Sequence, residues 1–283
     1  ADAPPDARMC LSRATYPLTI TAGAFPASPD HPSVIVVVPQ GFDPTPPLDL
    51  VVYIHGFNNC ITNVVGDTNT ACAPNTGIRQ ASSLATQLDA SGRNALLVVP
   101  EVMYDQASGD PGQLGVTDGM KALLTETLAS VPAPLGPLDL ASHGRVIVAT
   151  HSGGYQAASA MITFGGVPVD EVWLLDSLYG YTTRFDAWVM KDIASLASTR
   201  RFVDLYTSGG GTDQNSIAMA SRAASWVTAD PSVLIDDQST TPITDDALAH
   251  GLVFKHVAET HNDVPRVYME RLLATSKLAP VCN

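Results

Sequence analysis

The sequence predicts an α/β protein, in which helices cover both faces of a mostly parallel central sheet. Short apolar runs recur along the chain, and most are continuous rather than alternating, which is typical of strands buried on both faces. Segments with apolar residues at helical spacing lie between these runs. Hydrophobic residues make up 45% of the 283 residues, which is enough for a sizeable packed core.

The expected strands are rich in Val, Ile and Leu. VIVVV (34–38) lies between Pro-rich loops, and ALLVV (95–99) is ended by Pro100, because proline cannot donate a hydrogen bond to a neighbouring strand. RFVDLYT (201–207) contains Asp204, which we expect to be structural. The full set of expected strands is 34–38, 50–55, 95–99, 145–149, 171–176, 201–207 and 252–259.

The expected helices alternate with these strands. In 78–88, residues such as Ile78, Leu84 and Leu88 fit one helical face. Pro265 opens the last helix, where its missing N–H costs nothing. The expected helices are 78–88, 117–130, 154–163, 183–198, 215–228 and 265–278, and the long connections are 101–116, 207–214 and 237–250. No change of composition divides the chain, so we expect a single domain over residues 1–283.

The overall charge and hydropathy exclude some partners. The formal net charge is −13, which would repel a polyanion, so nucleic acid is not an expected partner. The chain lacks an apolar run of about 18 residues, so the sequence predicts no membrane span. It indicates no particular oligomeric state.

The four cysteines show no zinc-type spacing. Cys60 and Cys72 bracket a short polar loop, whereas Cys10 and Cys282 lie near the chain ends, so we expect the disulfides Cys60–Cys72 and Cys10–Cys282. Four reduced thiols in a cytosolic protein are the alternative. Disulfides are typical of oxidising compartments, and ADAPPDA (1–7) resembles a mature end left by signal-peptide removal. We therefore expect a secreted or periplasmic protein.

A serine stands where one buried strand is expected to end. The apolar run stops at Thr150, and His151, Ser152, Gly153 and Gly154 follow before an Ala-rich helix. In open α/β sheets, ligands gather at the carboxyl ends of the strands. A serine at such a strand-to-helix turn exposes its Oγ, and small neighbours allow the tight turn. The pattern is typical of the nucleophile elbow G-x-S-x-G, with Thr150 in the place of the first glycine. A serine that only caps the helix is the alternative.

At these residues the sequence resembles the α/β-hydrolase superfamily, in particular its serine esterases and lipases. The resemblance implies the α/β-hydrolase fold. In that family an HG motif after an early strand supplies part of the oxyanion hole, and YIHGFNN (53–59) matches it. The resemblance therefore implies that the N–H groups of Phe57 and Gly153 form the oxyanion hole.

The family's chain order, Ser then acid then His, selects the remaining catalytic candidates. His261 lies just after the last expected strand and before the final helix, where the family keeps its base, and His250 is the alternative. Asp176 closes the strand VWLLD, and WLLDSLYG resembles the lipase-type variant of the family. Asp213, in SGGGTDQN, is the alternative acid. We prefer Asp176, because it stands on a rigid element.

This set of residues predicts a serine hydrolase that cleaves carboxylic esters, small or polymeric, through an acyl-enzyme. Tyr104 and Tyr179 lie near expected strand ends and are candidates for binding the substrate, with ordinary packing as the alternative. No metal-binding helix, phosphate loop or dinucleotide motif is present, so no metal or cofactor is expected. An amidase, a peptidase, an acyltransferase or a non-catalytic binding protein on the same fold are the alternative functions.

Overall fold

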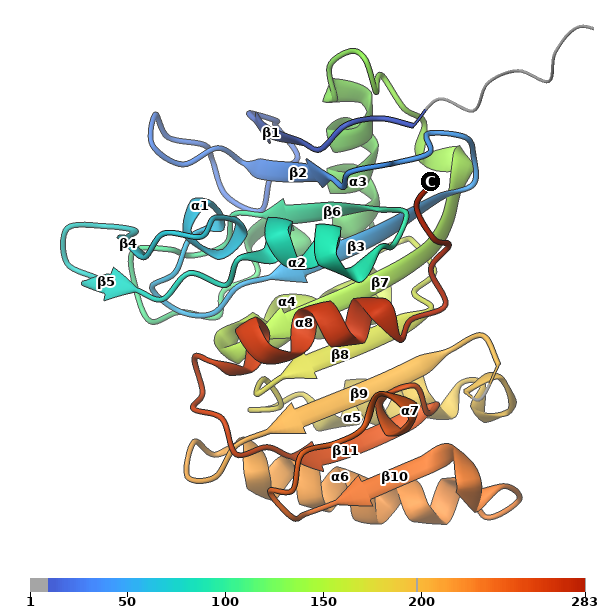
Figure 1. Ribbon diagram of the computed structural model, residues 1–283. Helices are drawn as coiled ribbons and strands as arrows, with labels where there is room; N and C mark the ends of the chain where they lie inside the picture. The colour runs from blue at the N-terminus through green and yellow to red at the C-terminus, as the bar shows by residue number, and fades with distance from the viewer. Residues whose placement is uncertain (1–9, 197, 283) are drawn as a thin grey trace, which may run out of the picture.

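A central sheet of nine strands organises the part of the chain that the computed structural model describes, residues 10–196 and 198–282 (Figure 1). The strand order is β1-β2-β6-β3-β7-β8-β9-β11-β10. At one edge, β1 pairs antiparallel with β2, and β2 pairs antiparallel with β6. All neighbouring pairs from β6 to β10 are parallel. The segment 1–7, on which the expectation of a mature end rests, lies outside the described residues.

The strands confirm the predicted parallel sheet. They are β1 (Ala14–Leu18), β2 (Val34–Val38), β3 (Leu48–Ile54), β6 (Ala95–Pro100), β7 (His143–His151), β8 (Glu171–Leu175), β9 (Arg201–Tyr206), β10 (Leu234–Asp237) and β11 (Leu252–His256). A separate hairpin consists of β4 (Thr70–Ala71) and β5 (Ile78–Arg79). All seven expected strands are present, although β11 ends at His256, three residues before the expected end at residue 259.

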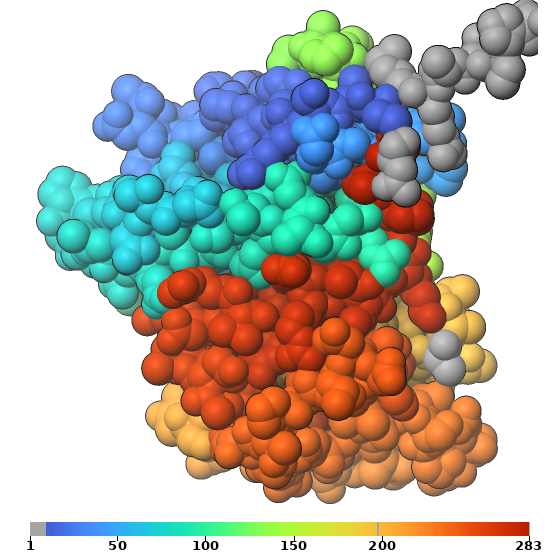
Figure 2. Space-filling model, viewed as in Figure 1, coloured from blue at the N-terminus to red at the C-terminus, as the bar shows by residue number. Residues whose placement is uncertain are grey.

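Helices cover both faces of the sheet, as the sequence predicts (Figure 1). One face carries α3 (Gly119–Ser130), α4 (Tyr155–Phe164), α5 (Thr182–Met190) and α6 (Thr212–Trp226). The other carries α1 (Ile61–Val65), α2 (Leu84–Ser91), α7 (Asp245–Leu248) and α8 (Val264–Ala274). Figure 2 shows the C-terminal segment, in red, filling the middle of this second face between the teal and orange segments.

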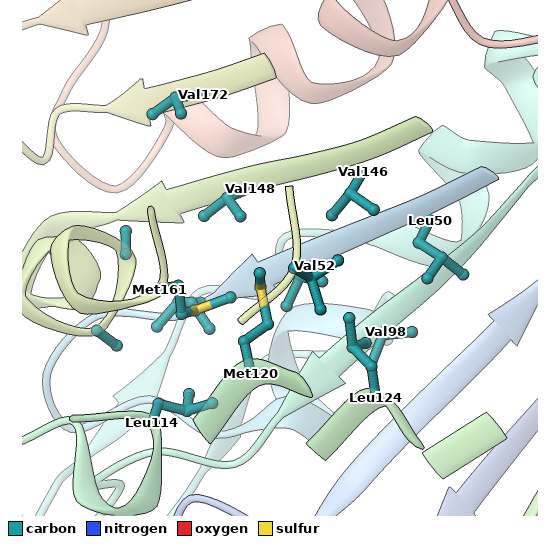
Figure 3. Packing of buried hydrophobic residues seen from close by; sticks show 14 of the residues in the cluster. Leu50, Val52, Val98, Leu114, Met120, Leu124, Val146, Val148, Met161 and Val172 are labelled. Carbon is teal, nitrogen blue, oxygen red and sulfur yellow. The ribbon is translucent and has the colours of Figure 1, made fainter. Parts of the chain in front are cut away.

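Alternate side chains of each central strand enter two separate cores. On β3, Leu50 and Val52 face the first core, whereas Val51 and Tyr53 face the second, and all four are fully buried. Figure 3 shows the first core, where Met120 of α3 and Met161 of α4 lie against the valines of β3 and β7. Burial on both faces explains why these strands are continuous apolar runs.

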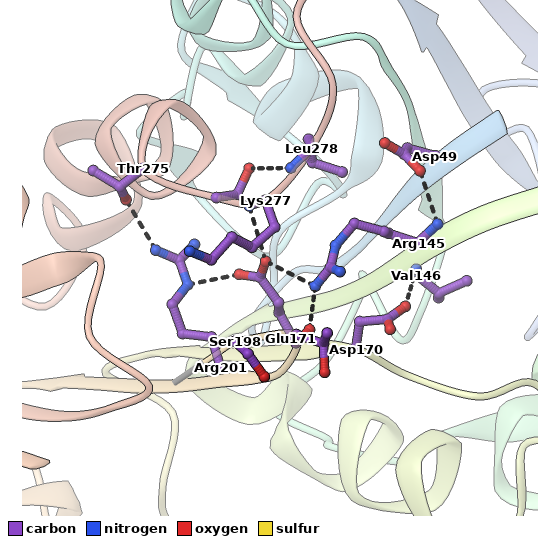
Figure 4. A network of polar contacts seen from close by, with 12 residues as sticks. Asp49, Arg145, Val146, Asp170, Glu171, Ser198, Arg201, Thr275, Lys277 and Leu278 are labelled. Carbon is purple, nitrogen blue, oxygen red and sulfur yellow. Dashed lines mark hydrogen bonds and ion pairs between the residues drawn. The ribbon is translucent and has the colours of Figure 1, made fainter. Parts of the chain in front are cut away.

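A network of polar side chains lies at the amino ends of the central strands (Figure 4). Glu171, at the start of β8, is fully buried and lies 2.6 Å from Nε of Arg201 on β9. Arg201 also donates to Thr275 Oγ1, just after α8, at 2.9 Å. The network ties the end of α8 to the sheet, on the edge opposite the carboxyl ends where the nucleophile is predicted.

The structure corrects three helix boundaries, one of which is the end of the last helix, at Ala274 instead of the expected residue 278. The helix expected over 78–88 begins only at Leu84. Ile78 lies in β5 instead, and 77% of its surface is exposed, so it does not contribute to the buried face of a helix. The helix expected over 183–198 ends at Met190 and is followed by a short 3₁₀ turn. Four strands, β1, β4, β5 and β10, and two short helices, α1 and α7, were not expected from the sequence.

Both expected disulfides are present. Cys60 is bonded to Cys72 and Cys10 to Cys282, with Cα–Cα separations of 5.6 and 6.0 Å. The first closes the segment that contains α1 and β4, and the second joins the two ends of the described chain. Within the described residues, no helix is both long and apolar enough to cross a membrane.

Candidate active site

Ser152 stands at the carboxyl end of β7, immediately before α4, in a left-handed backbone conformation with φ of 53°. This conformation is strained for a residue with a side chain, and it is typical of functional turns. Thr150, in the position of the motif's first glycine, is fully buried, and its hydroxyl lies 3.4 Å from Ser177 Oγ. The strand-to-helix turn therefore forms with threonine at that position.

Two glycines allow the loop after β3 to approach this turn. A Cβ on Gly56 would lie 2.6 Å from Ser152 Cβ, and a Cβ on Gly153 would lie 1.9 Å from the Phe57 ring. Contacts this short do not occur between real side chains, so both positions require glycine. The sequence motifs HG and SGG thus meet in space, as the order of the strands β3 and β7, which are neighbours in the sheet, requires.

His261 lies between a serine and an aspartate. Its Nε2 is 2.9 Å from Ser152 Oγ, and its Nδ1 is 2.6 Å from Asp176 Oδ2. An ionised carboxylate can only accept, so Nδ1 carries the hydrogen and Nε2 can accept the serine hydroxyl hydrogen. These three residues come from the ends of β7 and β8 and from the loop between β11 and α8.

Asp176 is fully buried and heavily hydrogen-bonded. Its carboxylate accepts hydrogen bonds from the Thr207 N–H at 3.0 Å, from the Thr207 hydroxyl at 2.5 Å and from the Thr212 hydroxyl. Burial alone would raise its pKa, but the hydrogen bonds from His261, Thr207 and Thr212 outweigh burial and lower the pKa to about 2. The carboxylate is therefore ionised at neutral pH.

His151 fixes the backbone of His261. Its Nε2–H donates to the His261 carbonyl oxygen at 2.9 Å, and the two ring centroids are 4.6 Å apart. Burial, and then repulsion from His261, lower the pKa of His151 to about 3, so this ring is neutral. The sequence placed His151 only within the turn, and nothing in it indicated this contact.

A buried carboxylate lies behind the loop after β3. Glu101 Oε1 is 2.7 Å from His55 Nε2, and its Oε2 is 3.1 Å from His31 Nδ1. Burial opposes ionisation, but the hydrogen bonds with His31 and His55 lower the pKa of Glu101 below its usual value. His55 Nδ1–H in turn donates to the Gly56 carbonyl oxygen at 2.8 Å.

This chain of contacts fixes the direction of one N–H group. In a trans peptide the carbonyl oxygen and the following N–H point in opposite directions. Because His55 holds the Gly56 carbonyl oxygen, it also sets the direction of the Phe57 N–H, which has no hydrogen-bond partner among the described residues.

A small cavity of about 210 Å³ opens beside Ser152. Its lining is mostly polar and includes Phe57 as the one large apolar side chain. The lining residues are Gly56, Phe57, Asn58, Asn59, Arg79, Gln80, Ser82, His151, Ser152, His261 and Asn262.

Two solved structures align with nearly the whole chain. The feruloyl esterase module from Clostridium thermocellum, as a mutant complexed with sinapinate, aligns with a TM-score of 0.54 at 11% identity, over 95% of this chain and 96% of that chain. A structure described as FAE gives a TM-score of 0.53, with the same identity and coverage. The chain has the α/β-hydrolase fold. No protein-family model and no curated protein sequence matches it.

On this α/β-hydrolase fold, the two candidate acids lie in different environments. Asp176 contacts His261, whereas Asp213 lies in the first turn of α6, where its carboxylate accepts the Gln214 N–H at 2.9 Å. The alternative base, His250, lies just after α7 and bonds the carbonyl oxygen of Asp246. The structure therefore brings Ser152, His261 and Asp176 together and leaves both alternatives outside.

The two tyrosines named as substrate-binding candidates do not line the cavity beside Ser152. Tyr104 stacks on His31 with ring centroids 3.6 Å apart, beside the Cys60–Cys72 disulfide. Tyr179 meets the His261 ring edge-on, at 6.3 Å between centroids. Of these two tyrosines, only Tyr179 thus borders the site formed by Ser152, His261 and Asp176. Among residues 10–196 and 198–282, no group of three or more His, Cys, Asp and Glu side chains is arranged as a metal site.

Proposed function

We propose that this protein is a serine hydrolase that cleaves carboxylic esters through an acyl-enzyme, with Ser152 as nucleophile, His261 as base and Asp176 as acid. The observation that carries the proposal is the position of the His261 ring, 2.9 Å from Ser152 Oγ and 2.6 Å from Asp176 Oδ2. The α/β-hydrolase fold adds support, and one similar structure is a feruloyl esterase module.

The reaction follows from this geometry. His261 Nε2 takes the hydroxyl proton as Ser152 Oγ attacks the ester carbonyl carbon, and the ionised Asp176 stabilises the resulting imidazolium. The N–H groups of Phe57 and Gly153 stabilise the oxyanion of the tetrahedral intermediate. His261 then protonates the departing alkoxide, which leaves the acyl group on Ser152. Water, deprotonated by His261, attacks that acyl group, and collapse of the second intermediate releases the acid.

A fluorophosphonate probe tests the proposal directly, because it labels an activated serine. We expect labelling at Ser152 and hydrolysis of p-nitrophenyl acetate, both of which Ser152→Ala abolishes while folding is retained. Ser232→Ala is the matched control, since that hydroxyl is exposed and bonds only Asp230. Unlabelled wild-type protein would instead indicate a non-catalytic binding protein on this fold.

The same purified protein separates esterases from the alternatives. Turnover of p-nitrophenyl acetate without detectable turnover of the matching p-nitroanilide indicates an esterase rather than an amidase or peptidase. Transfer of the acetyl group to an added alcohol, in preference to water, would indicate an acyltransferase.

We also propose that the protein works as one domain in an oxidising compartment outside the cytoplasm. The two disulfides support this location, and the single sheet, with β1 at one edge and β10 at the other, supports one domain. We expect the protein to unfold in one cooperative thermal transition, and reduction with dithiothreitol should lower its melting temperature. Two separate transitions would contradict the single domain, and a melting temperature that reduction leaves unchanged would remove the support for the compartment.

A further inference from the structure

Arg79 differs from the other described arginines in having no partner. Its guanidinium makes no hydrogen bond, ion pair or ring contact with any residue of the described chain, and its Nε is buried without a hydrogen-bond partner. Every other described arginine has an ion pair or a hydrogen bond, namely Arg13, Arg93, Arg145, Arg184, Arg200, Arg201, Arg222, Arg266 and Arg271.

This unpaired cation lies in the cavity that contains the proposed nucleophile. Arg79 and Ser152 line the same space of about 210 Å³. That volume is below the roughly 300–1,000 Å³ of sites for drug-sized ligands, so the space admits a small chemical group. Its largely polar lining does not suit a long alkyl chain.

The segment that carries Arg79 is held in place. Gln80, its neighbour, donates through Nε2 to Asp263 Oδ1 at 2.8 Å and accepts through its carbonyl oxygen from Asn63 at 3.0 Å. On the other strand of the hairpin, the Cys60–Cys72 disulfide holds the end of β4, because Cys72 directly follows Ala71. A guanidinium on a fixed segment loses little entropy when it binds a ligand.

The charge balance makes an unpaired guanidinium unusual in this chain. The protein has 15 Lys and Arg against 28 Asp and Glu, so acidic partners are plentiful. Asp263, which bonds the adjacent Gln80, pairs with Thr260 and Arg266 instead of Arg79. A partly buried cation without a partner is unfavourable by itself, and a guanidinium is well shaped to hold a carboxylate through two parallel hydrogen bonds.

We propose that Arg79 binds a carboxylate of the substrate, so that the preferred substrates are esters carrying a free carboxylate in the part that enters the cavity beside Ser152. The inference rests on the proposed ester hydrolysis at Ser152 and adds the substrate class. Asn58, whose side-chain amide has no hydrogen-bond partner among the described residues, lies in the same lining and can donate a further hydrogen bond.

Two ester pairs test this preference at pH 7, one for each side of the ester. For the alcohol part, 3-acetoxybenzoate is compared with 3-acetoxybenzamide. For the acyl part, monoethyl succinate is compared with ethyl levulinate. We expect the wild-type kcat/KM to favour the carboxylate in at least one pair by about tenfold or more, as a charged hydrogen bond supports. Arg79→Gln should remove that preference, mainly through KM, and Arg79→Lys should keep part of it.

Arg13→Gln is the matched control, because it removes the same charge from an arginine paired with Asp89 outside the cavity. We expect this variant to keep the wild-type preference. Equal preference in wild type and Arg79→Gln for both pairs would overturn the inference, while hydrolysis of the neutral esters would leave the proposed function intact. Labelling of Ser152 without turnover of either carboxylate ester would likewise overturn only the inference. Absence of both labelling and turnover would overturn both proposals.

Discussion

Nε2 of His151 donates a hydrogen bond of 2.9 Å to the carbonyl oxygen of His261, so the residue before the proposed nucleophile holds the backbone of the proposed base. The two rings are in contact, and His151 is neutral because its burial lowers its pKa to about 3. A neutral ring adds no positive charge beside His261. The contact joins the turn after β7 to the loop before α8, next to the proposed nucleophile and the proposed base.

Loss of this contact should reduce catalysis without removing a reacting group. His151→Ala frees the loop of His261, and a small displacement of the base lowers kcat by about tenfold to a hundredfold. KM should change little, because His151 does not hold the substrate. Steady-state kinetics measure both constants, and His151→Gln, which restores an N–H donor, should recover part of kcat. A wild-type kcat in His151→Ala would contradict this role.

Asp176 and Asp213 should respond very differently to the same substitution. Asp176→Asn removes the carboxylate that orients His261 and stabilises its cation, and we expect kcat to fall by about 10⁴-fold. Asp213→Asn should alter kcat less than about threefold, because this carboxylate contacts the Gln214 N–H and not His261. Kinetics of both variants, with their unfolding midpoints as a check on folding, distinguish the two acids. A larger loss in Asp213→Asn would refute the assignment.

Asp204 should make the stability of the fold depend on pH. It is fully buried in β9, and burial raises its pKa to about 8, with a smaller contribution from the charge of Asp176. In the unfolded chain an aspartate ionises near pH 3.9. The folded state therefore binds the proton more tightly, and the free energy of unfolding falls as pH rises from about 4 to about 8, by at most about 1.4 kcal/mol per pH unit.

Asp204→Asn should remove that fall. Urea unfolding at several pH values between 5 and 8 should show the variant gaining stability over wild type as pH rises. Asp192→Asn is the control, because Asp192 is exposed, and it should follow the wild-type curve. A constant difference between Asp204→Asn and wild type across this range would show that Asp204 is not protonated in the folded protein.

Local sequence patterns predicted most of the central sheet, because each strand buried on both faces is a continuous apolar run. β1 was not expected, since only alternate residues of Ala14–Leu18 are partly buried, and Pro17 interrupts the run. β10 was not expected for a related reason: it is a short edge strand with two aspartates and no fully buried residue. Edge strands lack the double burial that makes a strand visible in sequence.

The sequence likewise predicted some residues of the candidate site and not others. Ser152, Asp176 and His261 each follow a strand, and the chain order of the family that the sequence resembles, Ser then acid then His, predicted that they meet. Glu101 also follows a strand, β6, but nothing in the sequence indicated its contacts with His31 and His55, or the position of Arg79. Both depend on how the β4–β5 hairpin and the loop before β2 pack around the loop after β3. Contacts between segments far apart in the chain are set by tertiary packing, which no local pattern contains.

The pairing of Glu101 with His55 predicts that Glu101 helps to orient the Phe57 N–H of the proposed oxyanion hole. His55 holds the Gly56 carbonyl oxygen, and thereby the direction of the Phe57 N–H, while Glu101 holds the far side of the His55 ring. Glu101→Gln replaces the ionised acceptor with a neutral amide, so the ring and the loop gain freedom. Loss of an oxyanion donor costs about 10²–10³ in rate, and partial misalignment should cost about tenfold.

The expected signature is a lower kcat, a nearly unchanged KM and slower labelling by a fluorophosphonate, because the phosphonyl oxygen also needs the oxyanion hole. His31→Gln serves as the comparison, since His31 contacts the other oxygen of Glu101 and lies one step further from the loop. Its effect on kcat should be smaller than that of Glu101→Gln. Equal kcat and labelling rates in wild type and Glu101→Gln would show that the direction of the Phe57 N–H does not depend on this carboxylate.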